Sequence, residues 1–125
     1  MNILFLDDDH HRIKQFRSKV PFVTITETSQ DCIEQLNARD WDMVFLDHDL
    51  GGEVYADSQR TDTGMEVVRH IVKHAPRIGE LYIHSGNEPA RKEMTAKLVD
   101  AGYTATPMPF WQLIVSIEVD GLRKE

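Results

Sequence analysis

The stretch MVFLDHDLG, residues 43–51, places three ionisable side chains directly behind a run of four apolar residues. An unbroken apolar run of this length is typical of a strand that is covered on both faces. Asp47, His48 and Asp49 then follow where that strand should end. Two neighbouring carboxylates repel each other, so a metal ion, a cationic side chain or a proton must compensate them. The stretch therefore predicts a buried strand with a polar site at its carboxyl end.

Segments with strand character alternate with segments of helical periodicity along the whole chain. Strands are predicted at residues 2–6, 22–26, 43–47, 80–85 and 103–107, and helices at residues 9–20, 64–74, 87–102 and 110–122. A further helix is predicted from an N-cap at Ser29, with Ile33 and Leu36 on its apolar face. Such alternation indicates a parallel sheet with helices on both faces. The predicted fold class is α/β, a doubly wound, parallel five-stranded sheet of the flavodoxin-like (βα)5 type, in one domain over residues 1–125.

Composition narrows the classes of function. The chain has 125 residues and a formal net charge of −7, which argues against a nucleic-acid backbone or an acidic lipid as the main partner. The single Cys32 cannot form an internal disulfide, and the first apolar run is too short for a signal peptide. No apolar stretch approaches the ~20 residues of a membrane span. We therefore expect a cytoplasmic protein that makes no use of a membrane.

Polar side chains stand at the ends of three predicted strands. They are Asp7, Asp8, Asp47, His48, Asp49, His84 and Ser85. In a doubly wound sheet, ligands bind beyond the carboxyl ends of the strands. We therefore expect three segments that are distant in sequence to converge on one rim of the sheet.

Two interpretations fit the acids that follow the first strand. Asp8 or Asp9 can cap the next helix, whose positive end also favours the other carboxylates. Alternatively, Asp7 and Asp8 lie beside Asp47 if the first and third strands are neighbours. Two or three carboxylates around a small cavity suit Mg²⁺ or Mn²⁺. Because a cap needs only one acid, a divalent metal site is the sharper hypothesis.

His48 and His84 end different strands, and each precedes a polar residue. Two imidazoles can act as general base and general acid on a phosphodiester, or one can ligate a transition metal. A hydrogen-bonded structural histidine is the alternative at each position. The remaining histidines lie on predicted helices and are expected on the solvated surface, with His10 nearest the rim: His10, His11, His70 and His74.

Three further polar residues are candidates for binding a phosphate at the rim. Arg12 either forms an ion pair with Asp8 or Asp9 or clamps a phosphate through two hydrogen bonds. Asn87 should cap a helix that begins at the rim, where free backbone N–H groups can hold an anion. Arg91, one turn further on, either contributes to that site or lies on the surface.

Other features of the chain are assigned to packing or remain open. Met94, Trp41 and Trp111 are expected to pack in the core. The polar loop at residues 51–63 is long for a connection between a strand and a helix. It is either a lid over the rim or an exposed insertion.

The order of the strand-end residues resembles a response-regulator receiver domain. In this resemblance Asp47 matches the phospho-acceptor, Ser85 matches the hydroxyl residue, and DTGMEVVRHI at 62–71 matches the opening of the third helix. The family carries a lysine where this chain has Met108. The cation that steadies a phosphoryl group is therefore missing, which argues against ordinary phospho-signalling.

A closer resemblance is to the cyclic-phosphate-processing receiver-like domains, over residues 3 to about 101. It is carried by FLDD (5–8) with Arg12, LDHDLG (46–51), TG (63–64) and HSGNEPARKEM (84–94). The pair Ala90–Arg91 departs from the glycine–arginine pair of that pattern. The resemblance implies a phosphoesterase acting on a cyclic phosphate or cyclic nucleotide. Small free-standing members of the family also occur in phages, so the resemblance is compatible with a phage origin.

The leading hypothesis is a phosphodiesterase for a small phosphate-bearing ligand. Nucleic acid would be recognised only through a terminal phosphate. Whether the protein forms a homodimer is left open. By role, the residues are Asp7, Asp8 and Asp47 for Mg²⁺ or Mn²⁺; His48, His84, Asp47 and Asp49 for proton transfer and its orientation; and Arg12, Ser85, Asn87 and Arg91 for the phosphate oxygens. One alternative is a module that sequesters a nucleotide without cleaving it. Another is a stand-alone receiver phosphorylated on Asp47.

Overall fold

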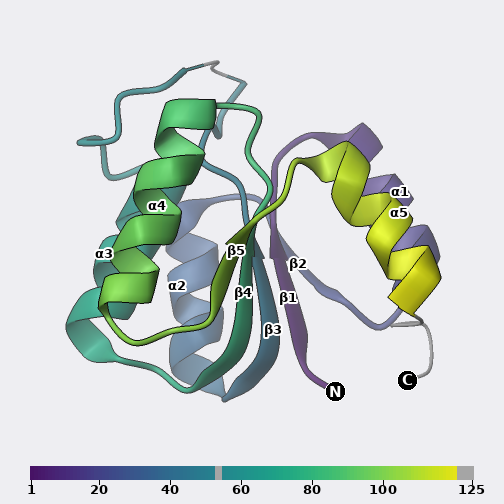
Figure 1. The fold of residues 1–125 in the computed structure, drawn as a ribbon, viewed down its shortest axis with the longest axis horizontal. Helices are drawn as coiled ribbons and strands as arrows, with labels where there is room; N and C mark the ends of the chain where they lie inside the picture. The colour runs from purple at the N-terminus through teal and green to yellow at the C-terminus, as the bar shows by residue number, and fades with distance from the viewer. Residues whose placement is uncertain (53–54, 121–125) are drawn as a thin grey trace.

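A single parallel sheet organises the protein. The computed structural model describes residues 1–52 and 55–120, and its sheet is seen edge-on in Figure 1. The strands are β1 (Ile3–Leu6), β2 (Thr24–Thr26), β3 (Trp41–Leu46), β4 (Ile78–Ile83) and β5 (Ala105–Pro107). Their order across the sheet is β2-β1-β3-β4-β5, and every neighbouring pair is parallel. The predicted fold class is therefore confirmed.

Helices cover both faces of the sheet. They are α1 (His10–Lys19), α2 (Ser29–Ala38), α3 (Gly64–His74), α4 (Glu88–Asp100) and α5 (Phe110–Asp120). Helices α1 and α5 lie on one face, and α2, α3 and α4 lie on the other (Figure 1). The predicted end of the last helix at residues 121–122 lies outside the described residues, as do residues 53–54 of the predicted loop.

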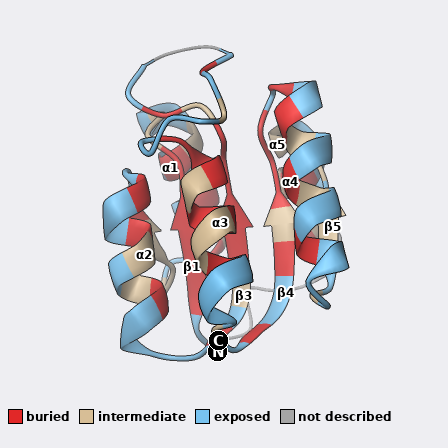
Figure 2. Cartoon of the chain, turned by 90° about the vertical axis from the view of Figure 1, so that its left-hand side faces the viewer, coloured by how far each residue is buried: buried red, intermediate tan, exposed pale blue. Residues whose placement is uncertain are grey.

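The central strands are buried on both sides, as the apolar runs require. All four residues of β1 are buried, and the last three of β3 are as well (Figure 2). On the α1 and α5 face, Phe5 stacks on Phe16 with a centroid distance of 4.3 Å. On the opposite face, Val67, Val68 and Ile71 of α3 pack with residues of β1, β3 and β4. The sheet is therefore a rigid base for whatever side chains follow its strands.

Helix caps differ in one place from the prediction. Thr28, and not Ser29, is the N-cap of α2, because its side chain accepts the Asp31 N–H at 3.1 Å. Ser29 begins the helix and donates its hydroxyl proton to the carbonyl of Thr61. Asp9 caps α1, as one interpretation of the acids predicted.

Packing predictions are confirmed for two large residues and wrong for one. Trp41 and Met94 are buried. Trp111 is 72 % exposed, because α5 packs on the core through Leu113 and Ile117, and Trp111 lies on its outer face. An aromatic residue within an apolar helix segment predicts burial only if the helix is covered all round, which α5 is not. No helix in the described part of the chain is long and apolar enough to cross a bilayer.

Candidate functional site

The carboxyl ends of β1, β3 and β4 place three polar side chains next to one another. Leu6 pairs with Leu46, and Leu46 pairs with Ile83, so the residues that follow them lie side by side. The ladder continues one step further, since Asp47 N–H donates to the Leu6 carbonyl and His84 N–H donates to the Leu46 carbonyl. Asp7, Asp47 and His84 consequently each offer one ligand atom within 4.8 Å of the others. The expected convergence of three distant segments is confirmed for these residues.

Asp7 is fully buried and is held as an anion. Arg12 donates to it twice, from Nε to Oδ2 at 2.8 Å and from Nη2 to Oδ1 at 3.0 Å. The Asp9 backbone N–H donates to Oδ1, and Nε2 of His84 lies 3.0 Å from Oδ2. Burial alone would raise the pKa of Asp7, but the hydrogen bonds with His84 and Arg12 outweigh it and hold the pKa well below its usual range.

Asp47 is equally buried but poorly compensated. Its Oδ1 accepts the His48 backbone N–H at 2.8 Å. Its Oδ2 has no hydrogen-bond donor within the described part of the chain, and Nη2 of Arg12 lies 3.5 Å away. Burial raises the pKa of Asp47 to about 6, with the charge of Asp7 adding to the rise and His84 and Arg12 opposing it. A buried carboxylate oxygen without a donor is costly, so it marks a place where a ligand would be stabilised.

His84 is fixed by a ring stack and by Asp7. Its imidazole lies parallel to the Phe5 ring at a centroid distance of 4.9 Å and meets Phe110 edge-on. Nε2 faces Asp7, while Nδ1 is buried without a hydrogen-bond partner among the described residues. The carboxylate of Asp7 therefore orients the ring, as one carboxylate commonly does for a histidine in a site.

The residues present fit a divalent cation. Two carboxylates and one imidazole within 4.8 Å form a donor set of the kind that binds Mn²⁺ and related ions, and the free Oδ2 of Asp47 is the open ligand. Arg12 supplies part of the compensating charge, since it pairs with Asp7 and lies 3.5 Å from Asp47. Asp8, predicted as a third metal ligand, lies outside this group, and its Oδ2 accepts the Gly52 N–H at 2.9 Å.

A pocket of about 510 Å³, here called the rim pocket, opens beside this group. It is lined by Asp8, Asp9, His10, Arg12, Asp47 and Asp49, with Gly52 from the loop after β3. Arg12 lines it with a side chain that is 36 % exposed, so its charge can reach a ligand. A small anion in this pocket would meet Arg12 and the Asp47 carboxylate together.

His48 and Asp49 form a separate cluster that holds the loop. Nδ1 of His48 lies 2.8 Å from Oδ1 of Asp49, and Nε2 lies 2.9 Å from Oγ of Ser58. Asp49 also accepts the backbone N–H groups of Tyr55 and Ala56, and these hydrogen bonds, with those from His48 and Asn87, overcome its partial burial and lower its pKa. His48 has no exposed surface and does not belong to the group formed by Asp7, Asp47 and His84. The structure therefore separates His48 from His84, which the sequence-based hypothesis had used as a pair.

The residues around the start of α4 are also engaged with the protein. Asn87 caps α4 through the Ala90 N–H, as predicted, and donates to Oδ1 of Asp49 at 3.2 Å. Ser85 is buried, and its hydroxyl accepts the Asn87 N–H. Arg91 donates to the Ser85 carbonyl at 2.6 Å. None of these three side chains lines the rim pocket.

Two positions that matter to the site carried no signal of their own in the sequence. Ser58 lies in a polar loop without periodicity, where nothing singles out one hydroxyl. Gly64 begins α3 so close to β3 that a Cβ atom would lie 1.8 Å from the carbonyl oxygen of Asp47. In the sequence, only the resemblance marks the TG pair at 63–64, and the structure gives the steric reason for the glycine.

Comparisons with known proteins give a family for the chain and agree with its fold. A family model described as the cyclic-phosphate processing receiver domain matches residues 2–100. No curated protein matches the chain. A CheY-like response regulator receiver domain protein from Methanospirillum hungatei is similar in structure, with a TM-score of 0.63 and 17 % identity over 95 % of this chain and 91 % of that one. A response regulator from Colwellia psychrerythraea has a TM-score of 0.67 and 14 % identity, covering 98 % of both chains. At such identities the solved structures show the fold alone.

Proposed function

The chain belongs to the family of cyclic-phosphate processing receiver domains, and from this membership we propose that it is a phosphoesterase that opens a cyclic phosphodiester at the rim pocket. One observation carries the proposal. Asp7, Asp47 and His84 meet within 4.8 Å, and the Asp47 oxygen that faces Arg12 lacks a hydrogen-bond donor in the described residues. Such a buried, uncompensated acceptor beside a cation and an open pocket favours a ligand site over a structural ion pair.

Charge compensation decides how an anionic substrate can bind there. A phosphodiester is negatively charged, and the pocket is lined by several carboxylates. The Asp47 carboxylate, with Asp7 beside it, would hold a divalent ion, Mg²⁺ or Mn²⁺, which would neutralise the phosphate and polarise its P–O bonds. Arg12 pairs with Asp7 and also lines the pocket, where its guanidinium can donate to a phosphate oxygen.

We assign proton transfer to His84 and positioning to His48. His84 is held by Asp7 in one orientation, as a general acid or base requires. His48 has both ring nitrogens engaged, with Asp49 and Ser58, and therefore orders the loop beside the pocket. Ser85, Asn87 and Arg91 support the same edge by fixing the start of α4.

Hydrolysis assays test the proposal directly. Purified protein is incubated with Mg²⁺ or Mn²⁺ and a panel of 2′,3′-cyclic, 3′,5′-cyclic and cyclic dinucleotide phosphates. We expect turnover of at least one class, its loss in EDTA, and a decrease of at least ~100-fold in kcat for His84→Ala. His70→Ala is the matched control, because His70 lies on α3 and pairs with Asn37 away from the pocket. If no class of substrate is turned over and His84→Ala is indistinguishable from the parent, the proposed enzymatic activity is wrong.

Two alternatives use the same residues. The receiver-like fold and the free Oδ2 of Asp47 are compatible with phosphorylation of Asp47. Met108, at the position where receivers carry a lysine, argues against it. Stable incorporation of phosphate from a small phosphodonor, abolished by Asp47→Asn, would support that function. Recovery of an intact nucleotide after heat denaturation of a complex would support a sequestering module.

A further inference from the structure

Helix α1 is basic in a protein that is acidic overall. Six of its ten residues are His, Arg or Lys, and it contains no carboxylate. The whole chain carries 21 acidic residues against 14 Lys and Arg, with a formal net charge of −7. Four of the 14 Lys and Arg residues thus lie on the one helix that begins at the rim pocket, with no acidic residue among them. A local concentration of this kind attracts anions even when the net charge repels them.

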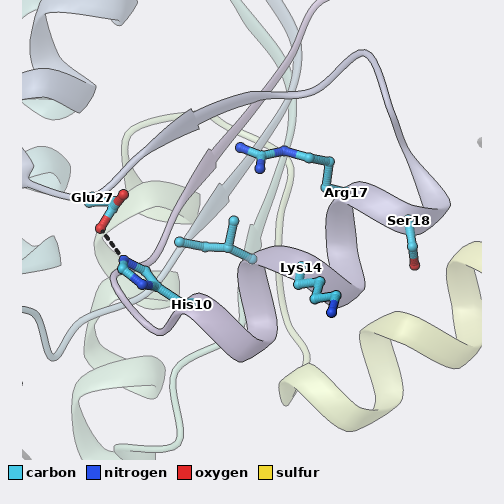
Figure 3. A pocket seen from close by; sticks show the side chains of 6 residues that line it. His10, Lys14, Arg17, Ser18 and Glu27 are labelled. Atoms are coloured by element: carbon cyan, nitrogen blue, oxygen red, sulfur yellow. Dashed lines mark hydrogen bonds and ion pairs between the residues drawn. The ribbon is translucent and has the colours of Figure 1, made fainter.

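A second pocket, here called the α1 pocket, runs along this helix. Its volume is about 560 Å³, and its lining residues are His10, Ile13, Lys14, Arg17, Ser18 and Glu27. The spacing of 10, 13, 14, 17 and 18 places the five helix residues on one face of α1. Figure 3 shows His10 beside Glu27, with Lys14, Arg17 and Ser18 further along the helix. Because His10 also lines the rim pocket, the two pockets are neighbours.

The cations of the α1 pocket are available to a ligand. Its one carboxylate, Glu27, is engaged with Nε2 of His10 at 3.0 Å. Lys14 and Arg17 are exposed, and neither forms an ion pair or a hydrogen bond through its side chain within residues 1–52 and 55–120. Arg12, in contrast, already donates two hydrogen bonds to Asp7. Two unpaired cations therefore line a hollow that opens next to the site.

We propose that the α1 pocket binds a second phosphate of the substrate whose cyclic phosphate is processed in the rim pocket. This inference rests on the proposed function and names its substrate class. The substrate would be a dinucleotide or longer oligonucleotide with a cyclic phosphate, and not a cyclic mononucleotide. His10 lines both pockets, so one extended ligand can pass from the rim pocket along this residue to Lys14 and Arg17. Buried Ile13 gives the pocket an apolar floor on which the nucleoside between the phosphates can rest.

Binding measurements with matched ligands test this inference. The two probes are a 2′,3′-cyclic mononucleotide, with one phosphate, and a dinucleotide ending in the same cyclic phosphate, with two. We expect Lys14→Gln/Arg17→Gln to weaken the dinucleotide Kd at least tenfold and to leave the mononucleotide Kd within twofold. Where the ligands are turned over, KM and kcat replace Kd, and the loss should fall on KM. The control Lys73→Gln/Arg77→Gln removes the same charge from exposed positions at and beyond the C-terminal end of α3.

Each outcome decides between the site and its alternatives. Equal losses for both probes, or no loss for either, would overturn the second-phosphate site. An equal loss in the control variant would show only a general effect of net charge and would overturn it as well. Inorganic phosphate titrated alone tests a site for free anions, and a response to it without any advantage for the dinucleotide also counts against the proposal. If the double variant weakens only dinucleotide binding but the protein turns over no ligand, the α1 pocket is supported as a binding site and the phosphoesterase activity is contradicted. Failure of the second-phosphate site and failure of the proposed function are therefore distinguishable.

Discussion

At the level of single residues, the two neighbouring aspartates of the site have opposite electrostatic environments. Asp7 has its pKa held well below the usual range by His84 and Arg12, whereas burial raises the pKa of Asp47 to about 6. Both carboxylates are buried at the ends of adjacent strands. What separates them is the number of donors, because Arg12 is bidentate on Asp7 and only lies near Asp47. Asp7 is therefore the carboxylate whose charge the protein itself compensates, whereas Asp47 keeps one oxygen open for a ligand.

This difference predicts opposite effects of two similar substitutions on stability. Folding raises the pKa of Asp47 from 3.8 to about 6. The native state therefore keeps a proton that the unfolded chain has lost between about pH 4 and 6, and the free energy of unfolding falls as pH rises through that window. Asp47→Asn removes this cost and should raise the free energy of unfolding by about 1–3 kcal/mol at pH 8. Urea denaturation at pH 4 and pH 8 measures it, with the gain confined to the higher pH.

Asp7→Asn is the matched comparison. The pKa of Asp7 is depressed in the folded protein, so its contribution to stability is present above the unfolded value near 3.9 and is lost only in acid. Removing its charge leaves Arg12 without its bidentate partner and should destabilise the protein by about 3 kcal/mol at neutral pH. A stabilising Asp7→Asn, or a destabilising Asp47→Asn, would contradict this assignment of the two carboxylates.

Gly64 sets how closely α3 approaches the site. A Cβ atom there would lie 1.8 Å from the Asp47 carbonyl oxygen and 3.0 Å from the His48 Cα, and both are backbone atoms that cannot rotate away. Gly64→Ala should therefore cost about 3 kcal/mol or more, measured as a lower urea midpoint, because α3 must shift from β3. Gly86→Ala is the control, since a Cβ at Gly86 meets nothing within 4 Å. Equal stability of the two variants would show that α3 can move freely.

Strand-end chemistry was the part of the site that the sequence could predict. Apolar runs locate where strands end, and parallel pairing brings Asp7, Asp47 and His84 together without knowledge of any side-chain angle. Side-chain direction was not predictable in the same way. His48 follows its strand by one residue more than Asp47, so it points to the opposite side of the sheet and bonds to the loop. The sequence prediction had placed His48 beside His84.

At the level of elements, the segment after β3 is fixed by its own first residues, His48 and Asp49, and by side chains from the loop before α1 and from α3. Asp8 accepts from Gly52, Asp49 accepts from Tyr55 and Ala56, and His48 bonds to Ser58. Arg69 of α3 completes the set, donating to the carbonyls of Ser58 and Arg60. The sequence left two interpretations open for this segment, a lid over the rim or an exposed insertion. In the structure, these hydrogen bonds attach its described residues to the edge of the rim.

Arg69 is the residue through which this anchoring can be tested. Arg69→Gln removes both donors to the loop carbonyls, and we expect several-fold faster hydrogen exchange at amides of residues 55–61 because the loop opens more often. Glu66→Gln is the control, since it removes the 2.8 Å ion pair with Arg69 and leaves both loop contacts. That exposed pair is worth at most about 1 kcal/mol. Identical exchange in Arg69→Gln and the parent would show that Asp49 and His48 suffice.

For the whole molecule, alternation of apolar runs with helical periodicity was enough to predict the architecture. The central strands and all five helices were located, with shifts of one to two residues at most of their ends. The edge strands were predicted too long, because β2 and β5 have only three paired residues each, and residues 22–23 and 103–104 lie outside them. Pairing at a sheet edge depends on one neighbour only, so local β-propensity is a weaker guide there.

One sheet and its two helical layers should unfold together. Trp41 is buried on β3 and donates its indole N–H to the Gln35 carbonyl, whereas Trp111 is exposed on α5. In Trp111→Phe, fluorescence reports Trp41 alone, and we expect its urea transition to coincide with that of circular dichroism. The same substitution should change the free energy of unfolding by less than about 0.5 kcal/mol. Separate transitions for the two signals would indicate that one layer unfolds independently.

The bond between Asp7 and His84 joins residues 77 positions apart in the chain. Closing so long a loop is entropically costly and must wait until β3 has docked between β1 and β4. During refolding, the far-ultraviolet signal of the helices should consequently recover before any capacity to bind a ligand. Recovery of binding then serves as a stringent measure of complete refolding, because helix content alone does not require this contact.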